Sequence, residues 1–183
     1  MPATTQAPAG TKTPHDDAAQ KGGRAFVFGD NVDTDVLAPG LYMKGPITEL
    51  AKHCLETLDP AFAGAARPGD VVVAGSNFGM GSSREQAAMA LRALGIAAVV
   101  AKSFARIFYR NAMNLALPAL VCPDAGSIAA GDRLVVRAGD GVIENLTQHR
   151  RLACEPVPPH LLAMIADGGL LPHLAKKLKA ARA

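Results

Sequence analysis

The chain has 183 residues, of which 49% are apolar and 19% are charged. At ~150 residues per domain, this length and composition predict roughly one soluble globular domain and exclude a fibrous or fully disordered protein. The formal net charge is +3, but four cations follow Asp167, the last acid, so the residues up to Asp167 carry −1. A nucleic-acid footprint needs a cluster of basic residues in the folded part, and this charge distribution excludes one.

The apolar runs are too short for a membrane span. Residues 93–101 form a run of nine, whereas a transmembrane helix needs ~20. Residues 1–23 contain no Leu, Ile, Val or Phe and no secretory signal, so we expect a disordered N-terminal tail. Cys54, Cys122 and Cys154 are widely spaced, which favours buried free thiols in a reducing cytoplasm. We therefore expect a cytoplasmic protein with no membrane partner and no metal site of its own.

Hydrophobic periodicity and turn residues predict a βαβ unit in the first part of the chain. The expected elements are a strand at 24–28, a helix at 46–58, a strand at 71–74, a helix at 84–94 and a strand at 96–101. A connector rich in proline and glycine, residues 59–69, ends the first helix. A crossover helix between two buried strands is typical of a parallel sheet.

The second part of the chain continues the mixture of strands and helices. The expected elements are a helix at 104–117, a strand at 119–122, a hairpin of 133–137 with 142–146 and a helix at 161–166. Residues 177–183 are expected to form a short basic tail, with cations at a helix end where the dipole favours them. The folded domain is therefore placed at residues 24–176.

The most unusual segment is GSNFGMGSSREQ, residues 75–86, between a predicted strand and the helix that follows it. Its three glycines permit a positive φ and close approach of a ligand, and free N–H groups at a helix start attract an anion. Ser82, Ser83 and Arg84 lie at that point. Ser82 or Ser83 could simply cap the helix, because both have capping-box spacing. The hydroxyl of the other serine and the guanidinium of Arg84 would still be available to a ligand. We therefore favour a site for a small carboxylate or phosphate.

Other chemistries fit this loop poorly. Its glycines do not follow the dinucleotide order G-x-G-x-x-G, and Lys102 stands where a ribose-binding acid is expected. No lysine precedes the serines as in a P-loop, and the residues around Ser82 lack the last glycine of a G-x-S-x-G hydrolase turn. The five histidines have no spacing that supplies a base or a set of metal ligands.

Two further segments carry charged groups. Residues 30–35, DNVDTD, contain three acids, which taken alone are typical of a solvated turn and lack the glycine and closing Glu of an EF-hand. Arg106 and Arg110 lie one turn apart on the helix predicted at 104–117. This arginine pair is compatible with a solvated face or with a partner interface.

Three segments, taken in chain order, resemble the signature of the swivel domain of the aconitase superfamily: GDNVDTD (29–35), GSNFGMGSSREQA (75–87) and AKSFARIFYRNA (101–112). The likeness is closest to the family of 3-isopropylmalate dehydratase small subunits. It implies a three-layer β/β/α swivel fold of the α/β class, and a hydro-lyase that isomerises a 2-hydroxy acid by dehydration and rehydration. It also implies a large-subunit partner carrying a 4Fe-4S cluster, whose iron acts as Lewis acid on the substrate.

The resemblance also assigns roles to residues within these motifs. Ser82 matches the base that takes the carbon-bound proton of the substrate. Lys44 lies in the loop that senses the substrate side chain. The substrate-binding positions that we expect are Ser83, Arg84, Thr34, Asp35, Lys44 and Asn77. A serine alkoxide is tolerable where helix-start amides and a guanidinium stabilise its charge, so the assignment is physically consistent.

The resemblance leaves the substrate open. Isopropylmalate, in leucine biosynthesis, is the substrate expected first, although relatives that act on it typically have an apolar residue where this chain has Lys44. A cation there suits a homoaconitate-type substrate with an additional carboxylate, and a dimethylmalate-type dehydratase is a third alternative. A non-catalytic anion-binding domain of the same fold is the alternative from a different class.

Overall fold

Seven strands form one sheet in the order β4-β3-β2-β1-β5-β6-β7 in the computed structural model, which describes residues 22–182. The parallel half consists of β1 (Gly23–Val27), β2 (Val71–Ala74), β3 (Ala98–Ala101) and β4 (Ala119–Val121). The antiparallel half consists of β5 (Arg133–Arg137), β6 (Val142–Asn145) and β7 (Arg150–Ala153). Strand β1 joins the halves, because it pairs in parallel with β2 and antiparallel with β5.

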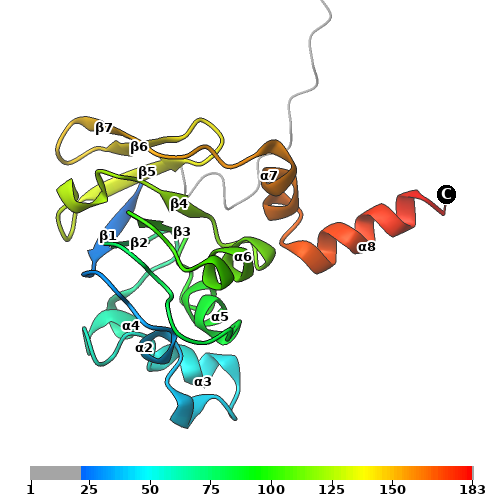
Figure 1. Cartoon of the computed structure of the whole chain (residues 1–183), viewed down its shortest axis with the longest axis horizontal. Helices are drawn as coiled ribbons and strands as arrows, with labels where there is room; N and C mark the ends of the chain where they lie inside the picture. The colour runs from blue at the N-terminus through cyan, green and yellow to red at the C-terminus, as the bar shows by residue number, and fades with distance from the viewer. Residues whose placement is uncertain (1–21, 183) are drawn as a thin grey trace, which may run out of the picture.

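The sheet curls so that its two halves pack against each other. Alternate residues of β2 point to opposite faces: Val72 belongs to the core under the helices, whereas Val71 and Val73 join Leu134 and Ile143 of the antiparallel half in a second core. Figure 1 shows β5–β7 above the parallel strands and the helices between residues 34 and 93 below them. This confirms the expected three-layer β/β/α fold of the α/β class.

The helices cover the parallel half and extend beyond it. They are α2 (Thr34–Leu37), α3 (Ile47–Lys52), α4 (Phe62–Ala65), α5 (Gln86–Ala93), α6 (Arg106–Asn114), α7 (Pro159–Ala166) and α8 (Leu170–Ala180), with short 3₁₀ turns η1 (Gly40–Tyr42) and η2 (Ala125–Ser127). Helix α5 contacts α2, α3 and α6, while α7 packs on α6 and α8 on α7. Within residues 22–182, none of the helices has the length and apolar character that crossing a membrane requires.

The helix predicted at 46–58 is wrong in length, because α3 ends at Lys52. Beyond it, Leu55 has a positive φ of 61°, and its N–H donates to the carbonyl of Val36 at 2.9 Å. Cys54 and Leu55 are both fully buried. Tertiary contact with α2 therefore turns the chain where helical periodicity alone would have continued it.

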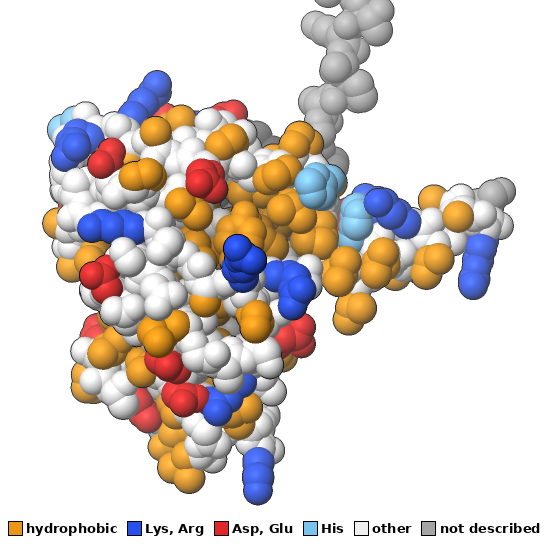
Figure 2. Space-filling view, in the orientation of Figure 1, with side chains coloured by type: hydrophobic (Ala, Val, Ile, Leu, Met, Phe, Trp, Pro, Cys, Tyr) orange, Lys and Arg blue, Asp and Glu red, His pale blue; other side chains and the backbone are white. Residues whose placement is uncertain are grey.

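Near the C-terminus, strand β7 was not predicted, and of helix α8 only a helix end at residues 177–183 was expected. Strand β7 exposes Arg150, Arg151 and Ala153 and buries only Leu152, so it lacks the apolar–polar alternation that predicts a strand. Helix α8 continues through the predicted boundary at residue 176 to Ala180 and projects from the body (Figure 1). Figure 2 shows apolar side chains over the region of α6 and α7 and along α8, and the exposed leucines of α8 are Leu171, Leu174 and Leu178.

Candidate active site

Three loops that follow β1, β2 and β3 lie side by side, because they continue the register of the parallel strands. Two backbone hydrogen bonds, both of 2.8 Å, join the loop after β1 to the loop after β2. Asn31 N–H donates to the Ser76 carbonyl, and Thr34 N–H donates to the Met80 carbonyl. On the other side, Phe78 N–H donates to the Ser103 carbonyl at 3.0 Å. The serine- and glycine-rich loop is thus fixed between two neighbours at the carboxyl ends of the strands.

Glycine is required at two points where the first two loops meet. A Cβ at Gly75 would overlap the carboxylate of Asp30, whose Oδ1 accepts the Ser76 N–H at 2.5 Å. Gly81 has a φ of +101°, and a Cβ there would lie 2.7 Å from Oδ1 of Asp33. The glycines expected to permit close approach of a ligand therefore also permit close approach of one loop to the other.

Ser82 is held by the loop after β1. Its N–H donates to Oγ1 of Thr34 at 2.9 Å, and the two hydroxyl oxygens lie 3.2 Å apart. Helix α5 begins at Gln86, and its N-cap residue, Glu85, makes no side-chain capping bond. The alternative in which a serine hydroxyl only caps the helix is therefore wrong, and the Ser82 hydroxyl faces Thr34 instead.

Arg84 brings a positive charge to the same place. It forms an ion pair with Asp35, whose side chain is 66% exposed against 29% for Arg84. A guanidinium has five N–H donors, so one carboxylate on Nη1 leaves donors for a second. Within residues 22–182, the N–H groups of Ser83 and Arg84 have no protein acceptor, and the Ser83 carbonyl accepts a bond from Asn111 at 3.2 Å. These donors suit an anion.

Asn77 lies in the same loop as Ser82 and Arg84, whereas Lys44 lies apart from both of them. The side chain of Asn77 donates to Oδ1 of Asn31 at 3.1 Å, and its N–H donates to Oγ of Ser103 at 2.8 Å, so it ties the three loops together. Lys44 is exposed just beyond η1. In the described part of the chain no hydrogen bond or ion pair joins it to Ser82 or Arg84.

The turn that carries Lys44 is nevertheless anchored. Tyr42 stacks on His53 with ring centroids 3.5 Å apart, and Nδ1 of His53 lies 2.6 Å from Oε2 of Glu56. The stack connects the turn after η1 to the segment that follows α3.

Asp33 is a site residue that the sequence reasoning missed. Its Oδ1 accepts the N–H of Asp35 at 2.6 Å, as the N-cap of α2, and lies 3.5 Å from Oγ1 of Thr34. The signal was present, because an Asp two residues before the accepting N–H is a common N-cap pattern. Arg106 and Arg110, left open between a solvated face and an interface, are both exposed.

The chain's own residues do not fit an iron–sulfur cluster. Cys54, Cys122 and Cys154 are free and buried, as predicted, and burial raises the pKa of each thiol, that of Cys154 to about 11. Cys54 lies in the core under the helices, and the other two lie in the core between the sheet halves. Residues 22–182 contain no group of three or more His, Cys, Asp or Glu arranged to hold a metal ion.

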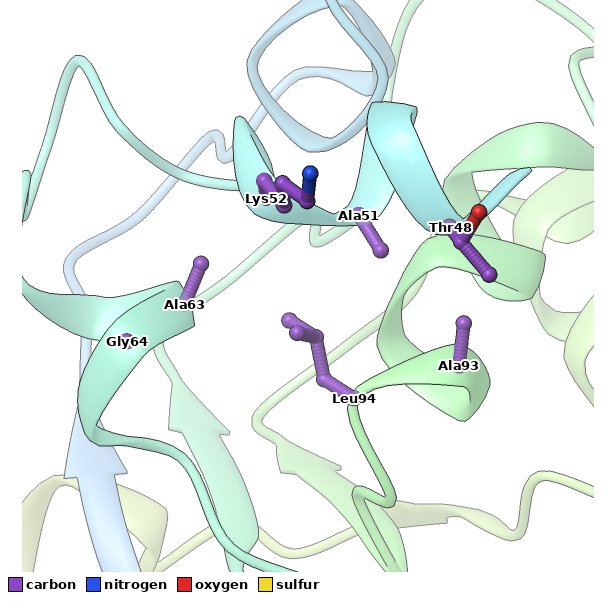
Figure 3. A pocket seen from close by; sticks show the side chains of 7 residues that line it. All are labelled: Thr48, Ala51, Lys52, Ala63, Gly64, Ala93 and Leu94. Carbon is purple, nitrogen blue, oxygen red and sulfur yellow. The ribbon is translucent and has the colours of Figure 1, made fainter. Parts of the chain in front are cut away.

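A separate hollow of about 340 Å³ lies between α3, α4 and α5 (Figure 3). Its lining is mostly apolar and includes Leu94 and Ala63, and its one charged residue, Lys52, is ion-paired with Glu49 at 2.6 Å. It therefore has fewer groups that could bind an anionic substrate than the loops around Ser82 have.

The curled β/β/α sheet carries serines, an arginine and free amides at the carboxyl ends of its parallel strands, and donors of this kind suit a carboxylate. Residues 50–125 match the family model of the aconitase C-terminal domain. Among curated proteins, the 3-isopropylmalate dehydratase small subunit of Moorella thermoacetica is 49% identical, over 86% of this chain and 96% of that protein. Small subunit 2 of the same enzyme from Archaeoglobus fulgidus is also 49% identical, over 84% and 94%.

A solved structure agrees with these relatives. The crystal structure of 3-isopropylmalate dehydratase from Methanocaldococcus jannaschii superposes with a TM-score of 0.83 at 40% identity, over 89% of this chain and 99% of that one. The chain belongs to the family of 3-isopropylmalate dehydratase small subunits. It is therefore one subunit of a hydro-lyase, as the resemblance of its three loop motifs implied.

Proposed function

We propose that this chain supplies the base and the carboxylate-binding groups of a 3-isopropylmalate dehydratase, which isomerises its substrate by dehydration and rehydration in leucine biosynthesis. The observation that carries the proposal is the placement of the Ser82 hydroxyl and the Arg84 guanidinium in one loop, against Thr34 and Asp35 of the next. Amides, hydroxyls and a guanidinium are the donors that carboxylates prefer.

In this proposal Ser82 is the catalytic residue. Its oxygen takes the proton from the carbon next to a substrate carboxylate, and the electron pair of that C–H bond stays on the substrate. The free N–H groups of Ser83 and Arg84 stabilise the negative charge at this point, because preorganised donors act most strongly where charge develops. General base catalysis of this kind contributes typically about 10²–10⁴-fold.

The substrate carboxylates bind to the neighbouring groups. Arg84 offers the guanidinium edge that Asp35 does not use, and the Ser83 hydroxyl and the Asn77 amide lie exposed in the same loop. Asp35 fixes the orientation of Arg84, so that the guanidinium is placed before the substrate arrives.

The remaining part of the active site belongs to a large subunit, which carries the 4Fe-4S cluster. Support comes from the small-subunit names of the relatives and from the three buried cysteines, which are unsuited to hold a cluster here. We place the assembled enzyme in the cytoplasm, where free thiols persist.

Lys44 supports a second candidate substrate. It is an exposed cation in a turn that the Tyr42–His53 stack holds in place. A homoaconitate-type substrate has one more carboxylate than isopropylmalate and would be favoured by this charge, whereas a dimethylmalate would not use it.

The test is anaerobic reconstitution with the large subunit, followed by turnover assays of wild type, Ser82→Ala and the control Ser127→Ala. Ser127 is an exposed serine in η2 whose hydroxyl bonds only locally, to the Asp124 carbonyl. We expect Ser82→Ala to lose on the order of 10²–10⁴-fold in kcat with unchanged folding, and Ser127→Ala to match wild type. Near-normal turnover of Ser82→Ala would remove Ser82 from the role of base. An inactive wild-type complex that still binds substrate would favour the non-catalytic domain.

A further inference from the structure

Thr34 makes two contacts with Ser82 although its own side chain is closed off from the substrate side. Its exposed fraction is 1%, and its Oγ1 accepts the Ser82 N–H at 2.9 Å. The same oxygen lies 3.2 Å from Oγ of Ser82 and 3.5 Å from Oδ1 of Asp33. A buried hydroxyl with these neighbours acts on Ser82 rather than on a substrate carboxylate.

The single hydrogen of the Thr34 hydroxyl has two acceptors within reach. While Ser82 is neutral, its O–H can donate to Oγ1 of Thr34, and the Thr34 hydrogen then points to Asp33. When Ser82 is ionised, its oxygen can only accept, so the Thr34 hydrogen turns toward it. The direction of this hydrogen bond therefore follows the charge on the Ser82 oxygen.

We propose that Thr34 is a positioning residue for Ser82, giving a hydrogen bond to the ionised base and returning it to Asp33 once Ser82 is protonated. The inference rests on the proposed function, in which Ser82 is the base. In the step concerned, the substrate C–H bond breaks, an O–H bond forms on Ser82, and the electron pair stays on the substrate. Thr34 keeps its own proton throughout, and only its direction changes.

The surrounding backbone holds the three side chains in this order. The Thr34 N–H donates to the Met80 carbonyl at 2.8 Å, and Asp33 and Met80 form an isolated parallel bridge. The absence of a side chain at Gly81 leaves the space that the Asp33 carboxylate and Oγ1 of Thr34 occupy. The charged groups near Ser82 are Asp33, behind Thr34, and the Asp35–Arg84 pair.

The experiment compares Thr34→Val, Thr34→Ser and Thr34→Cys in the complex reconstituted with the large subunit. Valine keeps the branched shape and removes the hydroxyl, and removal of a donor of this kind costs about 10²–10³-fold in kcat. We expect that loss in Thr34→Val, with KM little changed. The increase of kcat with rising pH should also occur at a higher pH than in wild type. Serine restores the hydroxyl and should restore both kcat and the pH profile. Cysteine, a weak donor, should lie between them and is the second measurement if valine prevents folding.

Several results would overturn the inference. One is that Thr34→Val or Thr34→Cys folds and keeps the wild-type kcat and pH profile. Another is that Thr34→Ser folds but loses as much activity as Thr34→Val. Ser82→Ala, measured alongside, separates the two proposals. If it is inactive while Thr34→Val is normal, the positioning role alone fails, and if it is active, the proposed base fails.

Discussion

Replacing Gly81 by alanine tests whether the contact between the first two loops positions Ser82, the proposed base. Gly81 has a φ of +101°, which an L-residue rarely adopts, and the new Cβ would lie 2.7 and 2.9 Å from the carboxylate oxygens of Asp33. Oγ1 of Thr34 would lie 2.9 Å away. The substitution therefore strains the backbone and pushes on Thr34, which holds Ser82, and on Asp33 next to it.

The size of the effect follows from these distances. Restoring ordinary contacts of 3.4 Å requires a displacement of about 0.5–0.7 Å in the Asp33–Thr34 segment or in the loop that carries Ser82. Left-handed backbone in an L-residue costs roughly 1–2 kcal/mol, which lowers Tm by about 2–8 °C in a chain of this size. Because a misplacement of about 1 Å can cost 10²-fold in rate, we expect kcat to fall roughly 10- to 100-fold.

The assay measures thermal unfolding of the subunit and turnover of the reconstituted complex, for Gly81→Ala and for the control Gly64→Ala. Gly64 lies in α4 and has no atom within 4 Å of its hypothetical Cβ. Its replacement should leave kcat unchanged and, as a helical glycine, stabilise the fold by about 0.5–1 kcal/mol. A Gly81→Ala complex with the kcat of wild type would refute the reasoning, even if its Tm falls.

The two remaining predictions concern the substrate and the C-terminal helix. Lys44→Met should raise kcat/KM for isopropylmalate relative to homoaconitate in parallel assays, because it removes a cation that only the additional carboxylate uses, and an unchanged ratio would place specificity elsewhere. Hydrogen bonds from Lys176 and His173 hold the pKa of Asp167 below its ordinary value. These contacts are therefore present above the unfolded pKa and lost as the pH falls through the folded value. The protection factors of the α8 amides, which correct for the intrinsic slowing of exchange in acid, should fall in wild type as the pH is lowered. Asp167→Asn should show low protection already at neutral pH, and Asp140→Asn, in an exposed turn, should behave as wild type. Equal exchange in the two variants would contradict the anchoring.

Local sequence signals predicted the fold well where burial follows the chain's own periodicity. The runs of small apolar residues at β2 and β3 indicate parallel strands buried on both faces, and the structure confirms them. The signal failed where tertiary contact decides. Nothing within residues 46–58 shows that Leu55 turns back to the Val36 carbonyl, and nothing local shows that β7 needs only Leu152 to pack on β6.

The site was predictable in its residue types but less so in its contacts. Glycines, serines and an arginine between a strand and a helix indicate an anion site, because the chemistry of the donors can be recognised without geometry. The N-cap role of Asp33 has a local signal, but its close approach to Gly81 could not be recognised in this way. It depends on the pairing of the segment around residue 33 with that around residue 80, and this register arises only when β1 and β2 lie together.

The openness of the loops around Ser82 is consistent with the proposed active site, which is shared with a large subunit. Abstraction of a proton from carbon is favoured where water is excluded and fixed dipoles replace it. Here Ser82 is only half-buried, and the Asp35 side chain is 66% exposed. The three loops are nevertheless pinned by backbone bonds before any partner arrives. In the proposed enzyme, a large subunit that docks over these loops would supply closure and the metal chemistry, but it would not have to organise Ser82.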